Sequence, residues 1–290
     1  MGVNDIAFPN LGIYLENVPK NITIFGFSIA FYGMIIGLGV LAGLLLAVEI
    51  AKRTGQNPEY YWDFVTYAII FSLLGARIYY VVFSWEYYKD NVDQIMNIRG
   101  GGMAIYGAVI GALATMYVYV RIKKISYLTM ADTAIPGLVI GQAIGRYGNF
   151  MNREAFGGYT DGLFAMRLPL EAVRMSDLTS DIMAHVTDGV DYIQVHPTFF
   201  YESMWNVGLL VFMLLYHKHK KFQGEILVIY LGGYGLGRGI IEGLRTDQLL
   251  IAGTSIAISQ LLGIVLFVVA IAIELYIRKR MTKIAKRKEI

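Results

Sequence analysis

The sequence predicts an all-α polytopic membrane protein with seven transmembrane helices and a small extracytoplasmic cap between spans four and five. Two observations support this fold class. The 290 residues are 56% hydrophobic and only 16% charged. Several apolar runs also reach about 20 residues, the length that crosses a bilayer core of about 30 Å. We therefore expect one membrane domain over residues 1–290, with residues 153–197 as a head insertion.

The apolar runs give the approximate bounds of the seven spans. They are Ile24–Ile50, Tyr61–Phe83, Met103–Val120, Tyr127–Ile144, Thr198–Tyr216, Glu225–Gly243 and Ser255–Ile277. In the head, residues 170–186 have a helical pattern with interspersed polar residues. Residues 190–196 alternate between apolar and polar side chains, which predicts a short strand.

The distribution of basic residues predicts the orientation. Lysine and arginine cluster after spans one, three, five and seven, which all end on the same side of the membrane. Cytoplasmic loops carry the excess of cations, so we expect a cytoplasmic C-terminus and an extracytoplasmic N-terminus. The head then faces outward.

Glycine pairs four residues apart recur within the spans. The pairs are Gly33/Gly37, Gly39/Gly43, Gly107/Gly111, Gly141/Gly145, Gly235/Gly239 and Gly239/Gly243. This spacing lines one helix face with small residues, so most of these pairs predict close helix packing.

The segment from Gly145 to Gly157 is the main candidate site, because it places ionisable groups at the end of span four. It contains Arg146, Asn149, Asn152, Arg153 and Glu154. Such groups near a membrane are costly to place and indicate function. Glu154 is a candidate partner for Arg146, and Arg153 is a candidate for a solvent-facing charge.

A second polar group lies in span six. Tyr234, Arg238, Glu242 and Arg245 are spaced four, four and three residues apart, so they share one helix face. One interpretation is an internal Arg238–Glu242 pair that only joins helices. The other is a site for an anionic headgroup, since guanidinium binds phosphate bidentately and stays charged.

Other candidates lie at the predicted outer ends of spans. Tyr106 follows the glycine-rich entry to span three, and Arg77 is an embedded cation in span two. His196 precedes span five and Glu202 is the carboxylate within it. For each, a structural role remains the alternative.

The residue types exclude several classes of protein. The chain has no cysteine, which rules out a protein thiol nucleophile and a disulfide framework. None of its four histidines has a metal-ligand spacing on one helix, so we expect no metal ion. We also expect no cofactor and no nucleic-acid partner.

Four motifs resemble the bacterial prolipoprotein diacylglyceryl transferases. They run from Arg146 to Gly157, Gly101 to Gly107, His196 to Glu202 and Tyr234 to Arg245, and Phe31-Tyr32-Gly33 also matches. The resemblance covers nearly the whole chain in the expected order. It departs at Tyr106, where many members have histidine.

The resemblance implies a multi-pass enzyme of the bacterial cytoplasmic membrane. Such an enzyme transfers the diacylglyceryl group of phosphatidylglycerol to the lipobox cysteine of a preprolipoprotein signal peptide and releases glycerol phosphate. Its partners are these two substrates and the membrane lipids. By this analogy the core positions are Arg146, Asn149, Gly157 and Arg238, with Tyr32 and Tyr234 beside them.

Chemical reasoning assigns further roles as hypotheses. Arg146 and Arg238 stabilise the leaving phosphate, and Tyr106, Glu202 or His196 accepts the thiol proton. Asn149, Asn152, Glu154, Gly157, Tyr32, Tyr234, Glu242, Arg245 and Arg77 complete the candidate substrate-binding set. The alternatives are a headgroup transporter or scramblase, which needs a polar path to the cytoplasmic face, and a non-catalytic scaffold, which needs no convergent arginines.

Overall fold

The computed structural model describes residues 2–98, 101–187 and 189–288. Part of the glycine-rich entry to span three, at Gly100, lies outside the described residues. The chain forms two compact units, Met1–Gly43 with Ile135–Ile290 and Leu44–Ala134. The boundaries between these units fall within helices α1 (Phe31–Arg53) and α5 (Tyr127–Asn152).

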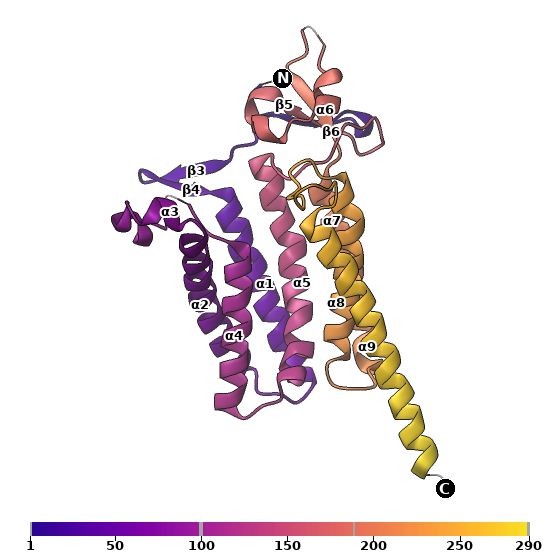
Figure 1. Cartoon of the computed structure of the whole chain (residues 1–290). Helices are drawn as coiled ribbons and strands as arrows, with labels where there is room; N and C mark the ends of the chain where they lie inside the picture. Colours follow the sequence, from indigo (N-terminus) through magenta and orange to yellow (C-terminus); the bar gives the residue numbers. More distant parts are fainter. Residues whose placement is uncertain (1, 99–100, 188, 289–290) are drawn as a thin grey trace. The chain divides into compact units, whose positions relative to one another are not determined.

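Within the described residues, five helices are long and apolar enough to cross a membrane. They are α1, α2 (Glu59–Phe83), α4 (Ile105–Lys123), α7 (Thr198–Tyr216) and α9 (Ile258–Lys288) (Figure 1). Helices α5 and α8 (Glu225–Ile241) stand where two further spans were predicted, but they are not among these five. Helix α8 has only 17 residues, and α5 carries polar side chains along its length.

The predicted start of span one was wrong. Residues 24–30 are not helical, and strands β3 (Asn21–Ile24) and β4 (Phe27–Ala30) form an antiparallel hairpin before α1. An apolar run alone does not distinguish a strand from a helix. Here the β-branched residues favour strands. Phe25 and Gly26, which both have positive φ, form the turn of the hairpin.

The head contains a four-stranded antiparallel sheet in the order β2-β1-β5-β6. The strand predicted at 190–196 is confirmed as β6 (Tyr192–Val195), which pairs with β5 (Met166–Pro169). The other two strands, β1 (Ile6–Phe8) and β2 (Ile13–Leu15), come from the N-terminus and were not predicted. The sheet covers a small apolar core built from Ile6, Phe156, Met166, Leu168, Ile182, Ile193, Val195 and Phe199.

The helix predicted over residues 170–186 is broken into short pieces. Two 3-10 turns, η3 (Leu170–Ala172) and η4 (Met175–Asp177), precede the five-residue helix α6 (Ser180–Ala184). Thr179 caps α6 by accepting a hydrogen bond from the backbone N–H of Ile182.

Arg153 ties the N-terminal segment to the end of α5. Its side chain is only 2% exposed, so the expectation of a solvent-facing charge was wrong. Its Nη2 donates to the carbonyl oxygens of Asn4 at 2.8 Å and Val18 at 2.5 Å. The guanidinium thus satisfies backbone acceptors that burial would otherwise leave unpaired.

Glycine pairs set the close approach of helices within each unit. A Cβ atom at Gly43 of α1 would lie 2.3 Å from the carbonyl oxygen of Gly137 on α5. Gly235 of α8 meets α9 in the same way, and these two helices lie side by side in Figure 1. In the other unit Gly75 of α2 lies against Gly107 of α4. The packing prediction fails for Gly33/Gly37, which have open space around them.

Candidate active site

The candidate site lies in the first unit, where α5, α7 and α8 contribute charged side chains. Arg146 is near the end of α5, Glu202 is in the first turns of α7, and Arg238 is in the last turn of α8. The Ser203 hydroxyl donates to the carbonyl of Ala143 on α5 at 3.0 Å. This bond fixes the two helices one residue from Glu202.

Glu202 brings the predicted arginines together. Its Oε2 lies 2.6 Å from Arg146 Nη2 and 3.2 Å from Arg238 Nη1. Its Oε1 lies 3.4 Å from Arg245 Nη1. One buried carboxylate is therefore in contact with three guanidiniums, one from α5 and two from the end of α8 and the 3-10 turn that follows it.

Glu242 forms the other side of the cluster. Arg238 Nη2 lies 2.6 Å from Glu242 Oε2, and Arg245 Nε lies 3.9 Å from the same oxygen. The Ser259 hydroxyl of α9 donates to Glu242 Oε1. Asp247 accepts two hydrogen bonds from Arg245, at 2.9 and 2.7 Å.

The cluster is balanced in charge. Three guanidiniums contact three carboxylates, those of Glu202, Glu242 and Asp247, and most of these side chains are largely buried. Desolvating unpaired charges would cost several kcal/mol per ion, by rough estimate, so pairing is what allows them to be buried. An entering anion would meet guanidiniums that are already paired with carboxylates.

A small cleft opens onto the cluster between α7 and α8. It is lined by Glu202, Trp205, Asn206, Tyr234, Gly237, Arg238 and Ile241. The Trp205 indole donates to the carbonyl of Gly233 at 2.9 Å, and its ring fills the space that a Cβ atom at Gly237 would need. The cleft has a volume of about 10 Å³, room for about one water molecule beside Glu202 and Arg238.

A second polar group surrounds Glu154 at the end of α5. Glu154 Oε1 accepts from the side-chain amides of Asn149 at 3.1 Å and Asn152 at 3.3 Å. Its Oε2 pairs with Arg174 of the head at 3.1 Å. The ion-pair partner of Glu154 is thus Arg174, whereas Arg146 pairs with Glu202.

Gly157 fixes the backbone beside the cluster. Its N–H donates to the carbonyl of His196 at 2.9 Å. Gly157 also forms an isolated antiparallel β-bridge with Arg245. A Cβ atom here would lie 2.8 Å from the carbonyl oxygen of Leu244. Only glycine fits this position without moving the segment that carries Arg245.

The remaining candidates of this unit lie around the cluster. His196 Nδ1 is 3.2 Å from the Tyr201 hydroxyl, and burial lowers the pKa of the His196 imidazole. The Tyr32 ring covers Gly148 of α5, where a Cβ atom would lie 2.7 Å from the ring. Tyr234 stacks on Tyr230 with ring centroids 5.4 Å apart.

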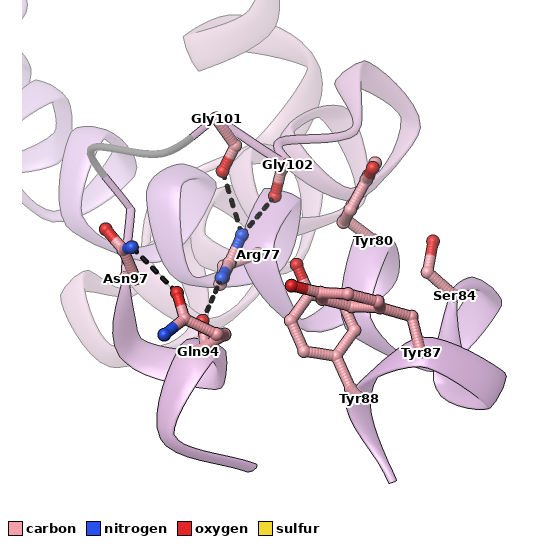
Figure 2. Close-up of a pocket in the computed structure, with 9 residues that line it drawn as sticks. All are labelled: Arg77, Tyr80, Ser84, Tyr87, Tyr88, Gln94, Asn97, Gly101 and Gly102. Carbon is pink, nitrogen blue, oxygen red and sulfur yellow. Dashed lines mark hydrogen bonds between the residues drawn. The ribbon is translucent and has the colours of Figure 1, made fainter. Parts of the chain in front are cut away.

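Arg77 and Tyr106 belong to the other unit. Arg77 donates to the carbonyl oxygens of Gln94, Ile95, Gly101 and Gly102, and its guanidinium lies 5.3 Å from the centroid of the Tyr88 ring. Figure 2 shows Arg77 with Gln94, Gly101, Gly102 and the Tyr88 ring. These residues line a pocket of about 400 Å³. Tyr106 packs against Tyr79 with ring centroids 6.3 Å apart.

Sequence reasoning missed Asp247, Ser259 and Arg174. Asp247 follows Arg245 by two residues, a local signal that could have identified it. Ser259 and Arg174 are distant in sequence from their partners, and nothing in their surroundings indicates the contact. Among the residues that the structure describes, no group of histidine and acidic side chains is arranged to hold a metal ion.

Fold and site together define a class of protein, namely a helical membrane protein with a buried arginine–carboxylate cluster. The family model for prolipoprotein diacylglyceryl transferase matches residues 19–276. The chain belongs to this family.

Curated relatives with high identity carry the name phosphatidylglycerol–prolipoprotein diacylglyceryl transferase. The relative from Clostridioides difficile is 43% identical over 244 residues, which cover 84% of this chain and 90% of that protein. The relative from Listeria monocytogenes is 42% identical over 263 residues, 91% of each chain. The relative from Bacillus cytotoxicus is 42% identical over 261 residues, 90% of this chain and 92% of its own. The chain is a multi-pass bacterial membrane protein.

Proposed function

We propose that this protein transfers the diacylglyceryl group of phosphatidylglycerol to the lipobox cysteine of a preprolipoprotein and releases glycerol phosphate. Family membership and the names of the relatives support this reaction. The geometric observation that carries it is the meeting of Arg146 and Arg238 on one carboxylate, beside a cleft. Two guanidiniums from different helices are suited to grip one phosphate from two sides.

In this proposal Glu202 holds the arginines until the lipid arrives. The phosphodiester of phosphatidylglycerol replaces the Glu202 carboxylate as the partner of Arg146 and Arg238. Such an exchange keeps each buried cation paired throughout, which avoids the large cost of an isolated charge. Glu242 and Arg245 keep Arg238 oriented through their contacts on the opposite side.

The transfer itself forms one bond and breaks one. The thiol sulfur attacks the glyceryl carbon next to the phosphate oxygen, the C–S bond forms, and the C–O bond breaks. The electron pair of that bond leaves with the oxygen of glycerol phosphate. Negative charge accumulates on the departing phosphate, where the two guanidiniums stabilise it most.

Glu202 is our preferred acceptor for the thiol proton. Once the lipid phosphate has taken over Arg146 and Arg238, the freed carboxylate oxygen lies beside the reacting group. His196 contacts Tyr201 and the Tyr106 ring packs against Tyr79, whereas Glu202 contacts both arginines, so both rank behind Glu202. The proton then passes to the product phosphate.

The other candidates have supporting roles. Asn149, Asn152 and Glu154 form a hydrogen-bonded group suited to the glycerol hydroxyls of the headgroup. Gly157 holds the backbone of Arg245, and Tyr32 and Tyr234 line the approach of the lipid. We assign Arg77 to the structure of its own loop, because it donates to four backbone carbonyls.

We further propose that α5 and α8 also cross the membrane, which gives seven spans in one domain over residues 1–290. The N-terminus and the head insertion at 153–197 then lie outside, and the C-terminus lies in the cytoplasm. The basic residues that follow alternate spans support this orientation.

A direct assay tests the reaction. Purified protein in phosphatidylglycerol vesicles is mixed with a lipobox peptide, and the products are followed by mass spectrometry. We expect a peptide mass increase of one diacylglyceryl group with equimolar glycerol phosphate, and no product from a peptide with serine in place of the cysteine. Headgroup flipping without either product would instead support a scramblase, and neither activity would support a scaffold.

A further inference from the structure

We propose that the β3–β4 hairpin inserts its apolar tip into the interfacial layer of the lipid bilayer, beside the start of α1. The hairpin covers residues 21–30 and its tip is Phe25-Gly26-Phe27. This inference is independent of the transfer reaction, because it rests only on exposure, backbone conformation and charge.

The hairpin exposes large apolar side chains at its tip and on one face, where Ile22 pairs with Ile29 and Ile24 pairs with Phe27. Phe25 is 98% exposed and Phe27 is 70% exposed, and three isoleucines of the same strands are each exposed by about two-fifths. Contiguous apolar surface of this kind marks an interaction site in proteins. A two-stranded hairpin without a covering layer is also only marginally stable in water.

The backbone of the tip adds a second, independent observation. Phe25 has φ of 49° and Gly26 has φ of 82°, the combination that a two-residue hairpin turn requires. Asparagine or glycine usually occupies the first of these positions, because a bulky side chain at positive φ is strained. A fully exposed phenylalanine at a strained position indicates a benefit that the folded protein alone does not provide.

The charge pattern identifies lipid as the partner. No charged residue occurs between Lys20 and Glu49, so the hairpin and most of α1 form one uncharged stretch. An uncharged, aromatic surface fits the boundary between headgroups and acyl chains, whereas a charged peptide would gain no ion pairs from it.

The fold places the hairpin where it can reach this layer. Strand β4 continues directly into α1, which is long and apolar enough to span a membrane. At its base, the Phe31 N–H donates to the carbonyl of Lys20 at 3.0 Å, and Lys20 Nζ donates to the carbonyl of Ala172 of the head at 3.1 Å. Figure 1 shows the hairpin extending sideways from the top of α1, rather than along its axis.

The experiment uses single-cysteine variants of the full chain, which contains no cysteine of its own. Phe27→Cys is labelled with an environment-sensitive fluorophore and reconstituted in phosphatidylcholine vesicles with shallow nitroxide-bearing lipids. The control is Tyr14→Cys on β2, which is 67% exposed on the head sheet. We expect at least threefold stronger lipid quenching at position 27, and stronger iodide quenching at position 14.

A second variant tests the tip without endangering the fold. Phe25→Asn keeps the turn, since asparagine suits positive φ, but removes the apolar side chain. In this background we expect lipid quenching at position 27 to fall at least twofold. We also expect equal lipid quenching in phosphatidylglycerol and phosphatidylcholine vesicles, because the hairpin has no charge.

Two outcomes would overturn the proposal. One is that position 27 shows the same iodide quenching and lipid quenching as position 14. The other is that position 27 contacts lipid only after a lipobox peptide is added.

Discussion

The carboxylate of Glu202 accepts contacts from three guanidiniums and is the only described acidic side chain that joins Arg146 to Arg238. At the scale of single residues, this explains how a charge-balanced cluster can be buried, and in our proposal it is also the site that binds the lipid phosphate. Each guanidinium is already oriented and desolvated, so an incoming phosphate meets preorganised donors. In this proposal, phosphate binding depends on the planar, forked donor geometry of arginine as well as on its charge.

Replacing Arg238 by lysine tests this point. Lysine keeps the charge but cannot bond Glu242 and a phosphate in two directions, so we expect diacylglyceryl transfer to fall about ten- to hundredfold, equivalent to about 1.5–3 kcal/mol for one charged hydrogen bond. The control is Arg278→Lys at the far end of α9, where the guanidinium pairs with Glu225 and Glu274. Initial rates in the peptide assay measure both. Wild-type turnover in Arg238→Lys would refute phosphate binding by the guanidinium fork.

His196 gives a prediction on pH. Burial lowers its pKa below the ordinary 6.5, so the unfolded chain binds more protons than the folded chain just below that pH. Stability that depends on neutral His196 is therefore fully present above pH 6.5 and is lost as the pH falls below it.

Thermal unfolding of His196→Gln between about pH 7 and 5 checks this window. We expect a shallower fall of Tm with decreasing pH than in the wild type. His185→Gln, which changes an exposed histidine of the head, serves as the control and should keep the wild-type slope. An unchanged slope in His196→Gln would exclude the buried imidazole as the cause.

At the scale of elements, glycine decides where helices touch. The faces of α1 and α5 meet at Gly39/Gly141 and Gly43/Gly137, with backbone atoms in contact. This packing holds α5, which carries Arg146 and Asn149 near its end, against α1. The pair at Gly33 and Gly37 has the same spacing but no neighbour within 4 Å. Spacing alone thus predicts the potential for contact, and the partner helix determines whether the contact exists.

Two alanine variants of α1 separate these cases. Gly43→Ala forces a Cβ atom to within 2.3 Å of a carbonyl oxygen, and we expect the free energy of unfolding to fall. Overpacking of this kind costs about 1–3 kcal/mol. Gly37→Ala has open space and should be neutral or stabilising by up to about 1 kcal/mol, because alanine favours helix. Thermal unfolding in detergent compares them, and equal stability of the two variants would contradict the packing argument.

At the scale of the whole molecule, the proposed topology depends on α5 and α8. Helix α8 has only 17 residues and carries Arg238 in its last turn, and α5 carries polar side chains along its length, including Arg146. Ionisable residues in membrane-spanning helices usually face the interior of the helix bundle, and they lower the apolar content of the helix. The five described helices that qualify by length and apolar composition do not include α5 and α8, so the proposal of seven spans needs a direct test.

Labelling of single cysteines by an impermeant maleimide in intact cells tests the seven spans. We expect Tyr14→Cys to react, and Lys52→Cys, Lys218→Cys and Lys283→Cys to react only after permeabilisation. Labelling at position 218 in intact cells would show that α5 does not cross the membrane. Protection at 218 with labelling at 283 would show the same for α8.

Much of the fold and the choice of site residues followed from the sequence. Apolar runs identified all seven long helices, because hydropathy and length are local properties. Five residues of the arginine cluster were among the predicted candidates because charges in apolar runs are rare, namely Arg146, Glu202, Arg238, Glu242 and Arg245. The strand at 192–195 followed from alternation in the same way.

The tertiary structure alone decided which of these groups are partners. Arg146 pairs with Glu202 instead of the nearby Glu154, Glu154 pairs with Arg174, and Arg153 is buried under the N-terminal segment. The two N-terminal strands complete a sheet through the pairing of Ala7 with Arg167, which lie 160 positions apart in the chain. A contact between distant segments depends on how helices and strands pack, and the local spacing of residues contains no information about that packing.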